Sequence, residues 1–200
     1  MNIGENKSKF INDMITFKNE IQKSLQNNIN STELDEYRNS YQNKFSKERF
    51  KNYFVEKISL HIVFKYILIR MSEDSQKIVN PKLNKEGIRN WNDISKNYRK
   101  DYHMLFNIAS EDIRRTKELG DIFTPCIYDN YMEKLQHSVF NKKEDNHIEI
   151  LKEYEFGTLD PNTVVSLFDK LYPSEERENL QAFLKDSKII TYLMKSLGLI

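Results

Sequence analysis

The chain has 200 residues, of which 38% are hydrophobic and 30% are charged, and its formal net charge is +1. This length and composition predict one good-sized globular domain, or two small ones, and exclude an intrinsically disordered chain. Only five glycines and four prolines are present. Their scarcity favours long helices and argues against a β-sandwich or barrel.

Cysteine content and hydropathy bear on the compartment of the protein. The single cysteine, Cys126, excludes an intrachain disulfide and a cysteine-rich zinc site. The first residues, MNIGENKSKF, contain no apolar segment typical of a secretory signal. The longest apolar stretch, 58–71, is shorter than the roughly 20 residues that a bilayer requires. We therefore expect a cytoplasmic protein without a membrane span.

The N-terminal segment shows the first helical pattern. Five apolar residues recur at steps of three and four, as on one face of an amphipathic helix: Phe10, Met14, Phe17, Ile21 and Leu25. The polar stretch QNNINSTE then interrupts the pattern. We predict an N-terminal helix with a polar linker over 1–30 and a single helical domain over 31–200.

The next helix start is predicted at Thr32, with Asp35 three residues on as its reciprocal acid. Helical spacing then continues towards the segment EKISLHIVFKYILIRMSED, residues 56–74. This segment is too short and too charged for a membrane, so we interpret it as the central core helix. Its apolar residues are predicted to be buried: Ile58, Ile62, Ile67 and Leu68.

Arg70 ends this apolar run and is followed by Glu73 and Asp74. An arginine with an acid three or four residues further along a helix can form an ion pair. We predict that Arg70 and Glu73 form a structural ion pair at the rim of the core.

The rest of the chain also shows helical spacing. Apolar stripes predict helices over 88–94, 98–113 (ending near Gly120), 128–139, 164–171, 180–184 and 189–197. Thr124 with Pro125, and Asp160 with Pro161, are typical helix starts because proline is tolerated at the first helical position. YEFGTL is the only short strand candidate, and we interpret it as a loop. The sequence thus predicts an all-α fold, a multi-helix bundle of about eight or nine helices without a substantial sheet.

Charge is distributed unevenly along the chain. Residues 42–103 contain 14 Lys and Arg against 7 Asp and Glu, whereas 104–187 contain 10 against 17. The two halves either pack together and neutralise each other, or the basic half faces an anionic partner such as nucleic acid. Seven residues of the basic half are the candidate phosphate contacts: Lys44, Lys47, Arg49, Lys51, Lys96, Arg99 and Lys100.

The sequence contains no recognisable catalytic, cofactor or metal motif. The five glycines are isolated and form no phosphate-binding loop. His137 and His147 are not at metal-ligand spacing, and pairs such as Glu149 and Glu153 are typical of solvated helix surfaces. We therefore predict no catalytic residue, no cofactor and no metal.

The cysteine and two of the histidines are the remaining candidate site residues. Cys126 beside Pro125 could be a nucleophile at a helix N-terminus, but no histidine or carboxylate partner is identifiable, and we favour a small buried hydrophobe. His61 and His103 lie within apolar stripes, where a histidine is usually a core or boundary residue.

The order of segments from Phe50 onward resembles the helical N-terminal region of adenine-specific DNA methyltransferases of the type IIG and BREX kinds. The resemblance covers roughly 50–197 and is one of pattern and order. It lies in FKNYFVEKISLHIVFKYILIRMSED, YHMLFNIASEDI, DIFTPCIYDNYMEKL and YEFGTLDPNTVVSLFDKLYPSEER. TLDPNTVVSLFDKLYP is similar to the helix that precedes the cofactor-binding start of the methylase in that family.

The departures from this family concern its catalytic part. FLKDSK stands where the family has a Phe-Tyr-Thr-Pro motif, and neither its glycine-rich cofactor loop nor its Asn-Pro-Pro-Tyr motif is present. The resemblance therefore implies a non-catalytic module for DNA modification, restriction and phage defence. Such a module would be a scaffold or a sequence-independent contact to double-stranded DNA, next to a methyltransferase domain or subunit.

The alternative is a helical protein–protein interaction or oligomerisation module without a nucleic-acid role. In that case the amphipathic helix at Phe10–Leu25 would fold against a partner or a second copy. An enzyme with an unrecognised helical active site ranks last, because no paired titratable groups stand out at usable spacing.

Overall fold

The computed structural model describes residues 1–40, 46–75, 80–95, 101–172 and 187–196, and the description below refers to these residues. The fold is all-α, as predicted; the only strand-like pairing there is an isolated bridge between Asn2 and Glu155. The α-helices are α1 (Lys7–Asn28), α2 (Ser31–Ser40), α3 (Lys47–Asp74), α4 (Lys85–Ile94), α5 (Tyr102–Arg114), α6 (His147–Leu151), α7 (Pro161–Leu171) and α9 (Lys188–Ser196). Short 3-10 or π turns are η1 (Ile127–Tyr131), η2 (Glu133–Leu135), η3 (Gln136–Phe140) and η4 (Phe156–Thr158).

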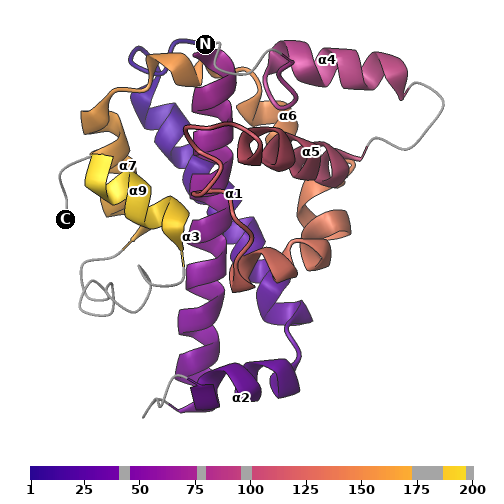
Figure 1. Ribbon diagram of the computed structural model, residues 1–200, viewed down its shortest axis with the longest axis vertical. Helices are drawn as coiled ribbons and strands as arrows, with labels where there is room; N and C mark the ends of the chain where they lie inside the picture. The colour runs from indigo at the N-terminus through magenta and orange to yellow at the C-terminus, as the bar shows by residue number, and fades with distance from the viewer. Residues whose placement is uncertain (41–45, 76–79, 96–100, 173–186, 197–200) are drawn as a thin grey trace.

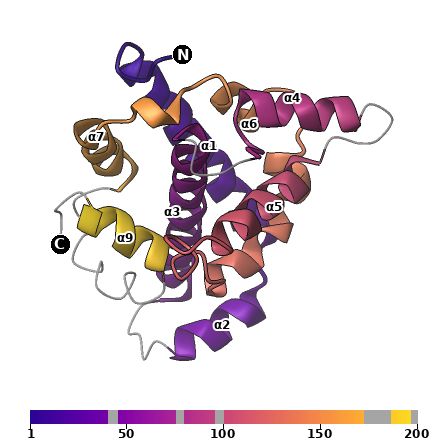
Figure 2. The same ribbon diagram turned by 45° about the horizontal axis from the view of Figure 1, so that its top comes forward.

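Helix α3 is the central element around which the other helices are arranged (Figure 1). Helices α7 and α9 lie on one side of it, whereas α4, α5 and α6 lie on the other (Figures 1 and 2). Helix α1 crosses behind α3, and α2 lies near the beginning of α3 (Figure 1). Because neighbours surround it, every residue from Lys57 to Arg70 is buried.

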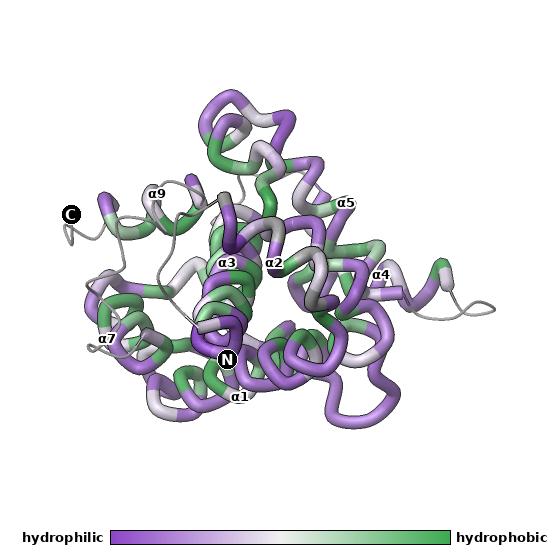
Figure 3. The backbone as a smooth tube through the Cα atoms, turned by 90° about the horizontal axis from the view of Figure 1, so that it is seen from below, coloured by the Kyte–Doolittle hydropathy of each residue, from purple (hydrophilic) through white to green (hydrophobic). Residues whose placement is uncertain are grey.

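The burial of α3 confirms its prediction as the core helix. Ile58, Ile62 and Ile67 are fully buried, and Leu68 is 4% exposed. Figure 3 shows the hydrophobic residues of α3 in the interior, with hydrophilic segments on the outside. The buried residues of α3 lie on all sides of the helix, so neighbouring elements have to cover it on all sides.

The N-terminal helix α1 belongs to the same core. Its predicted stripe from Phe10 to Leu25 is buried, and the Phe17 ring lies 5.7 Å from the Tyr66 ring of α3 in an edge-on contact. The polar linker is short, since α2 begins at Ser31. The stripe that we considered for docking to a partner is therefore used inside the chain.

Three predicted helix boundaries were wrong. Asn30, not Thr32, caps α2, because its side-chain oxygen accepts a hydrogen bond from the Thr32 backbone N–H (3.0 Å). Helix α5 ends at Arg114, before Gly120. The segment after Pro125 begins its first turn only at Ile127 and forms η1, η2 and η3 in place of one α-helix.

The reason for the last difference lies in local hydrogen bonds. The Asp129 carboxylate accepts the Cys126 backbone N–H (2.7 Å), and the Asp129 N–H donates to the Cys126 carbonyl (3.0 Å). Bonds over three residues give tight 3-10 turns, which an apolar stripe alone does not distinguish from an α-helix. By contrast, Asp160 and Pro161 begin α7 as predicted, with the Asp160 carboxylate accepting the Thr163 N–H (3.0 Å).

Candidate functional site

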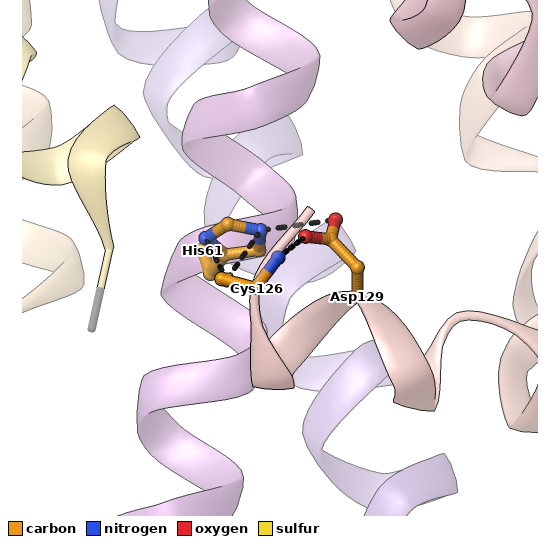
Figure 4. A group of neighbouring side chains, drawn as sticks. All are labelled: His61, Cys126 and Asp129. Carbon is orange, nitrogen blue, oxygen red and sulfur yellow. Dashed lines mark hydrogen bonds and ion pairs between the residues drawn. The ribbon is translucent and has the colours of Figure 1, made fainter. Parts of the chain in front are cut away.

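Two buried side chains on α3 define the candidate site. His61 and Lys65 are four residues apart, so they lie on the same face of the helix, and both are more than nine-tenths buried. Asp129 of η1 faces them, and Cys126 lies at the beginning of the same turn (Figure 4). A polar cluster thus lies at the middle of the core helix.

Asp129 holds this cluster together. One of its carboxylate oxygens accepts hydrogen bonds from Lys65 Nζ (2.5 Å) and His61 Nε2 (3.2 Å). The other accepts the Cys126 N–H. Burial would raise the pKa of Asp129, but the bonds and charges of His61 and Lys65 outweigh burial and hold this pKa well below its usual range. Asp129 is therefore a carboxylate at neutral pH.

The partners of His61 determine its tautomer. An ionised carboxylate only accepts hydrogen bonds, so His61 Nε2 carries the proton that faces Asp129. The other ring nitrogen, Nδ1, lies 2.9 Å from the hydroxyl of Ser187, the residue directly before α9. Burial lowers the pKa of His61, against the opposing effect of Asp129, so the ring is neutral at pH 7. His61 thereby links η1 to α9.

The connectivity Ser187–His61–Asp129 is that of a hydrolytic triad, but the surroundings do not suit one. Ser187 is fully buried, and its hydroxyl oxygen also accepts the Ile190 N–H (3.4 Å) as a helix cap. A nucleophile must be open to substrate and next to donors that stabilise an oxyanion. The triad geometry here is a structural link between elements.

Cys126 does not form a catalytic pair with His61 either. Its sulfur lies 3.8 Å from Nε2 and 4.0 Å from Nδ1. A sulfur that is almost equally distant from both nitrogens lies along the in-plane lone pair of neither. Burial raises the pKa of the thiol to about 12, and the Asp129 charge adds to this effect. The thiol is thus protonated and a poor nucleophile at neutral pH.

His61, Cys126 and Asp129 all have side chains that can bind a metal ion. Single ligand atoms of His61, Cys126 and Asp129 all lie within 4.8 Å of one another, and a thiolate, an imidazole and a carboxylate are typical zinc ligands. However, the Lys65 ammonium lies on the carboxylate oxygen that also faces His61. The position of the sulfur is also off both lone-pair directions of the ring. The arrangement fits a buried ion network better than a metal centre.

A second buried cluster lies at the end of α3 and contains the predicted Arg70–Glu73 pair. Arg70 Nε lies 3.7 Å from Glu73, but both residues are buried, at 1% and 4% exposure, and are not at the rim as we expected. Arg70 also bonds Asp74 (3.0 Å) and donates to the carbonyls of Leu151 (3.0 Å) and Tyr154 (2.8 Å). Apolar side chains also cover the guanidinium. One of them is Phe156, whose ring centre lies 4.6 Å from the guanidinium carbon.

Glu73 has a different set of partners. Its carboxylate accepts backbone N–H groups of three consecutive residues, Lys82, Leu83 and Asn84, at 2.7–3.1 Å. Burial raises the pKa of Glu73, although the N–H groups of Lys82 and Leu83 oppose this. Asn84 is the cap of α4, accepting the Gly87 N–H (2.9 Å). Glu73 thus fixes the loop that leads into α4.

The predicted phosphate contacts are only in part within the described residues. Lys44, Lys96, Arg99 and Lys100 lie outside them. Lys47 and Arg49 are exposed and Lys51 is half-buried, and all three lie in the first two turns of α3. Lys47 pairs with Asp35 (2.5 Å), and Lys51 donates to the Gln26 carbonyl (2.7 Å). The structure therefore brings three of the seven together at one end of the core helix.

Sequence reasoning missed the cluster around Asp129. His61 and Lys65 are visible as polar residues four apart within an apolar run, which is the only local signal. Asp129 is 64 residues from Lys65, and Ser187 is 126 residues from His61. Their meeting depends on how η1 and α9 pack on α3.

Comparisons with known proteins add no relative. No family model, no curated protein and no solved structure matches the chain. Within the described residues, no helix combines the length and apolar character needed to cross a bilayer.

Proposed function

We propose that the chain is a non-catalytic, cytoplasmic helical module of a DNA modification or restriction system. In this proposal it serves as a scaffold, or as a sequence-independent DNA contact, beside a methyltransferase domain or subunit. The order of helical segments that resembles the N-terminal region of type IIG and BREX methyltransferases supports this. The buried clusters on α3 also support a scaffold, since their polar groups are used to fix neighbouring elements.

The observation that carries the DNA contact is the basic end of α3, defined here as Lys47, Arg49 and Lys51. The side chain of Lys47 is 69% exposed. The N-terminus of a helix carries a partial positive charge, which adds to that of the side chains and favours phosphate. Contacts of this kind release counterions and give affinity without sequence information.

The pair between Lys47 and Asp35 does not prevent such a contact. Exposed ion pairs contribute little to stability and are screened by salt. A DNA phosphate can replace Asp35 as the partner of Lys47, at a small energetic cost. The contact is then expected to be weak and strongly dependent on salt.

The experiment is a gel-shift titration of duplex DNA across a salt series. We expect binding at low salt. The slope of the logarithm of the binding constant against the logarithm of the salt concentration should decrease in magnitude by about 0.9 for each phosphate contact removed. The variant K47A/R49A/K51A should weaken binding to all sequences equally. The matched control K143A/K170A/K188A removes the same charge from exposed lysines elsewhere and should bind more tightly than the first variant. Failure of the natural chain to bind even at low ionic strength would remove the DNA role.

A further inference from the structure

Outside the clusters on α3, the surface is hollowed along α5. The hollow is a groove of about 720 Å³ between α5 and the turns η2 and η3. Its lining recurs at steps of three or four along one face of the helix and includes Asp101, Met104, Ile108, Glu111 and Arg115. At 1.5 Å per residue these positions span about 20 Å. The groove is therefore long enough for four turns of a helix.

Two large apolar side chains, Met104 and Ile108, line the groove one helical turn apart. Met104 is 51% exposed, although it is a large hydrophobic residue in the first turn of α5. Ile108, one turn further along, is half-buried. Methionine adapts its shape easily and is common where a surface binds another chain. The other lining residues are polar or charged, so these two side chains are the apolar part of the groove.

The border is acidic. The lining of the groove contains four acidic residues, Asp101, Glu111, Asp112 and Glu133, and one charged basic residue, Arg115. His103 also lines the groove, but burial lowers its pKa, so it is neutral at pH 7. Glu111 pairs with Arg114 and Arg115, and Asp112 with Lys82. Such exposed pairs exchange partners readily. Glu133 is exposed, and its carboxylate has no ion pair or hydrogen bond among the described residues.

We propose that this groove binds a cationic amphipathic helix of a partner protein. The apolar face of that helix would lie on Met104 and Ile108, and its Lys or Arg side chains would face Glu133 and the other carboxylates. The length of the groove, its two apolar side chains one turn apart and its acidic residues match the helix-in-groove mode of recognition. Complementary charge gives this binding its selectivity. The acidic border repels nucleic acid, so this inference is independent of DNA binding at the basic end of α3.

The test uses fluorescence anisotropy with synthetic peptides of about 14 residues. The first peptide contains Leu and Lys at helical spacing, the second replaces each Lys with Glu, and the third replaces each Leu with Ser. The full chain is compared with M104S and E133Q, and with E144Q as a matched control at an exposed carboxylate elsewhere. Circular dichroism confirms that each variant is folded.

We expect the Leu/Lys peptide alone to bind, with a dissociation constant that rises about fivefold or more in M104S and about threefold in E133Q. E144Q should bind like the natural chain. No binding up to about 200 µM peptide would overturn the proposal. So would equal binding of the Ser/Lys peptide, or an equal loss in E144Q. A concentration-dependent dimer that E133Q abolishes in sedimentation experiments would overturn it too, by assigning the groove to a second copy.

Discussion

The two buried clusters of α3 differ in how they satisfy their charges. At the end of the helix, Arg70 bonds the backbone carbonyls of Leu151 and Tyr154, and Glu73 bonds N–H groups of the loop before α4. At the middle, His61 and Lys65 bond to the side chains of Asp129 and Ser187. The first cluster thus fixes the course of the backbone, whereas the second fixes the docking of two elements.

This difference has an energetic consequence. A buried charge that loses its partner is costly, because neither water nor another charge replaces what is lost. Removal of a group that bonds backbone leaves several unsatisfied atoms at once, such as the carbonyls of Leu151 and Tyr154 beside Arg70. Removal of a side-chain partner leaves one charge, which a second substitution can remove. The end of α3 should therefore be the more sensitive of the two clusters.

The largest effect is expected for Arg70→Ala. Loss of the guanidinium leaves two carbonyls and the acids of the helix end without their cation, and we expect unfolding to become easier by about 3–5 kcal/mol. Urea denaturation followed by circular dichroism measures this. Arg114→Ala is the control, since it removes an exposed arginine of an i,i+3 pair and should leave the midpoint unchanged. If R70A were as stable as the natural chain, the end of α3 would not be the more sensitive cluster. If it were stable but lost DNA binding, Arg70 would belong to a binding surface.

A smaller effect is expected for Asp129→Asn, about 2–4 kcal/mol, because the Lys65 ammonium then stays buried without its carboxylate. The double variant K65M/D129L removes both charges and should recover part of this loss. Urea denaturation of the single and double variants gives the coupling between the two residues. Additive losses would show that the cluster does not act as a unit, and would remove the distinction between the two regions.

The pH dependence sharpens the description of the middle cluster. Burial holds the pKa of His61 below its ordinary value of 6.5 in the folded chain, so the unfolded chain binds more protons as the pH falls below this value. The free energy of unfolding should therefore decrease from pH 7 to pH 5. His61→Gln should make the free energy of unfolding depend less on pH. The pKa of His103 is lowered too, so His103→Gln measures the share of the pH dependence that comes from His103. If the free energy of unfolding of H61Q depended on pH as strongly as that of the natural chain, a neutral buried His61 would be contradicted.

The smallest effect is expected for Cys126→Ser, which should change stability by about 1 kcal/mol or less, since a thiol forms only weak hydrogen bonds and serine is of similar size. The more informative measurement is its reaction with a thiol reagent at pH 8. Because the pKa is raised to about 12, modification of the folded chain should be at least about tenfold slower than in urea. Rapid modification of the folded chain would show an activated thiol and reopen the catalytic interpretation.

Sequence patterns predicted what depends on periodicity. The all-α fold, the burial of Ile58 and Ile62 in the core helix, and the start of α7 at Asp160 follow from local rules of spacing and capping. The short turns after Pro125 did not, because apolar spacing alone does not distinguish 3-10 and π turns from an α-helix. The pair of Arg70 with Glu73 follows from helical spacing. The partners of His61, and the carbonyls that Arg70 bonds, could not be predicted, since they come from segments more than 60 residues away.

The carboxylate of Glu73 occupies a position that phosphate or sulfate occupies in many proteins. Three consecutive N–H groups converge on it, as they do in an anion-binding nest. Because this anion is attached to the chain, its effective concentration is high and constant. The loop before α4 is therefore expected to keep its shape whatever anions the solution contains.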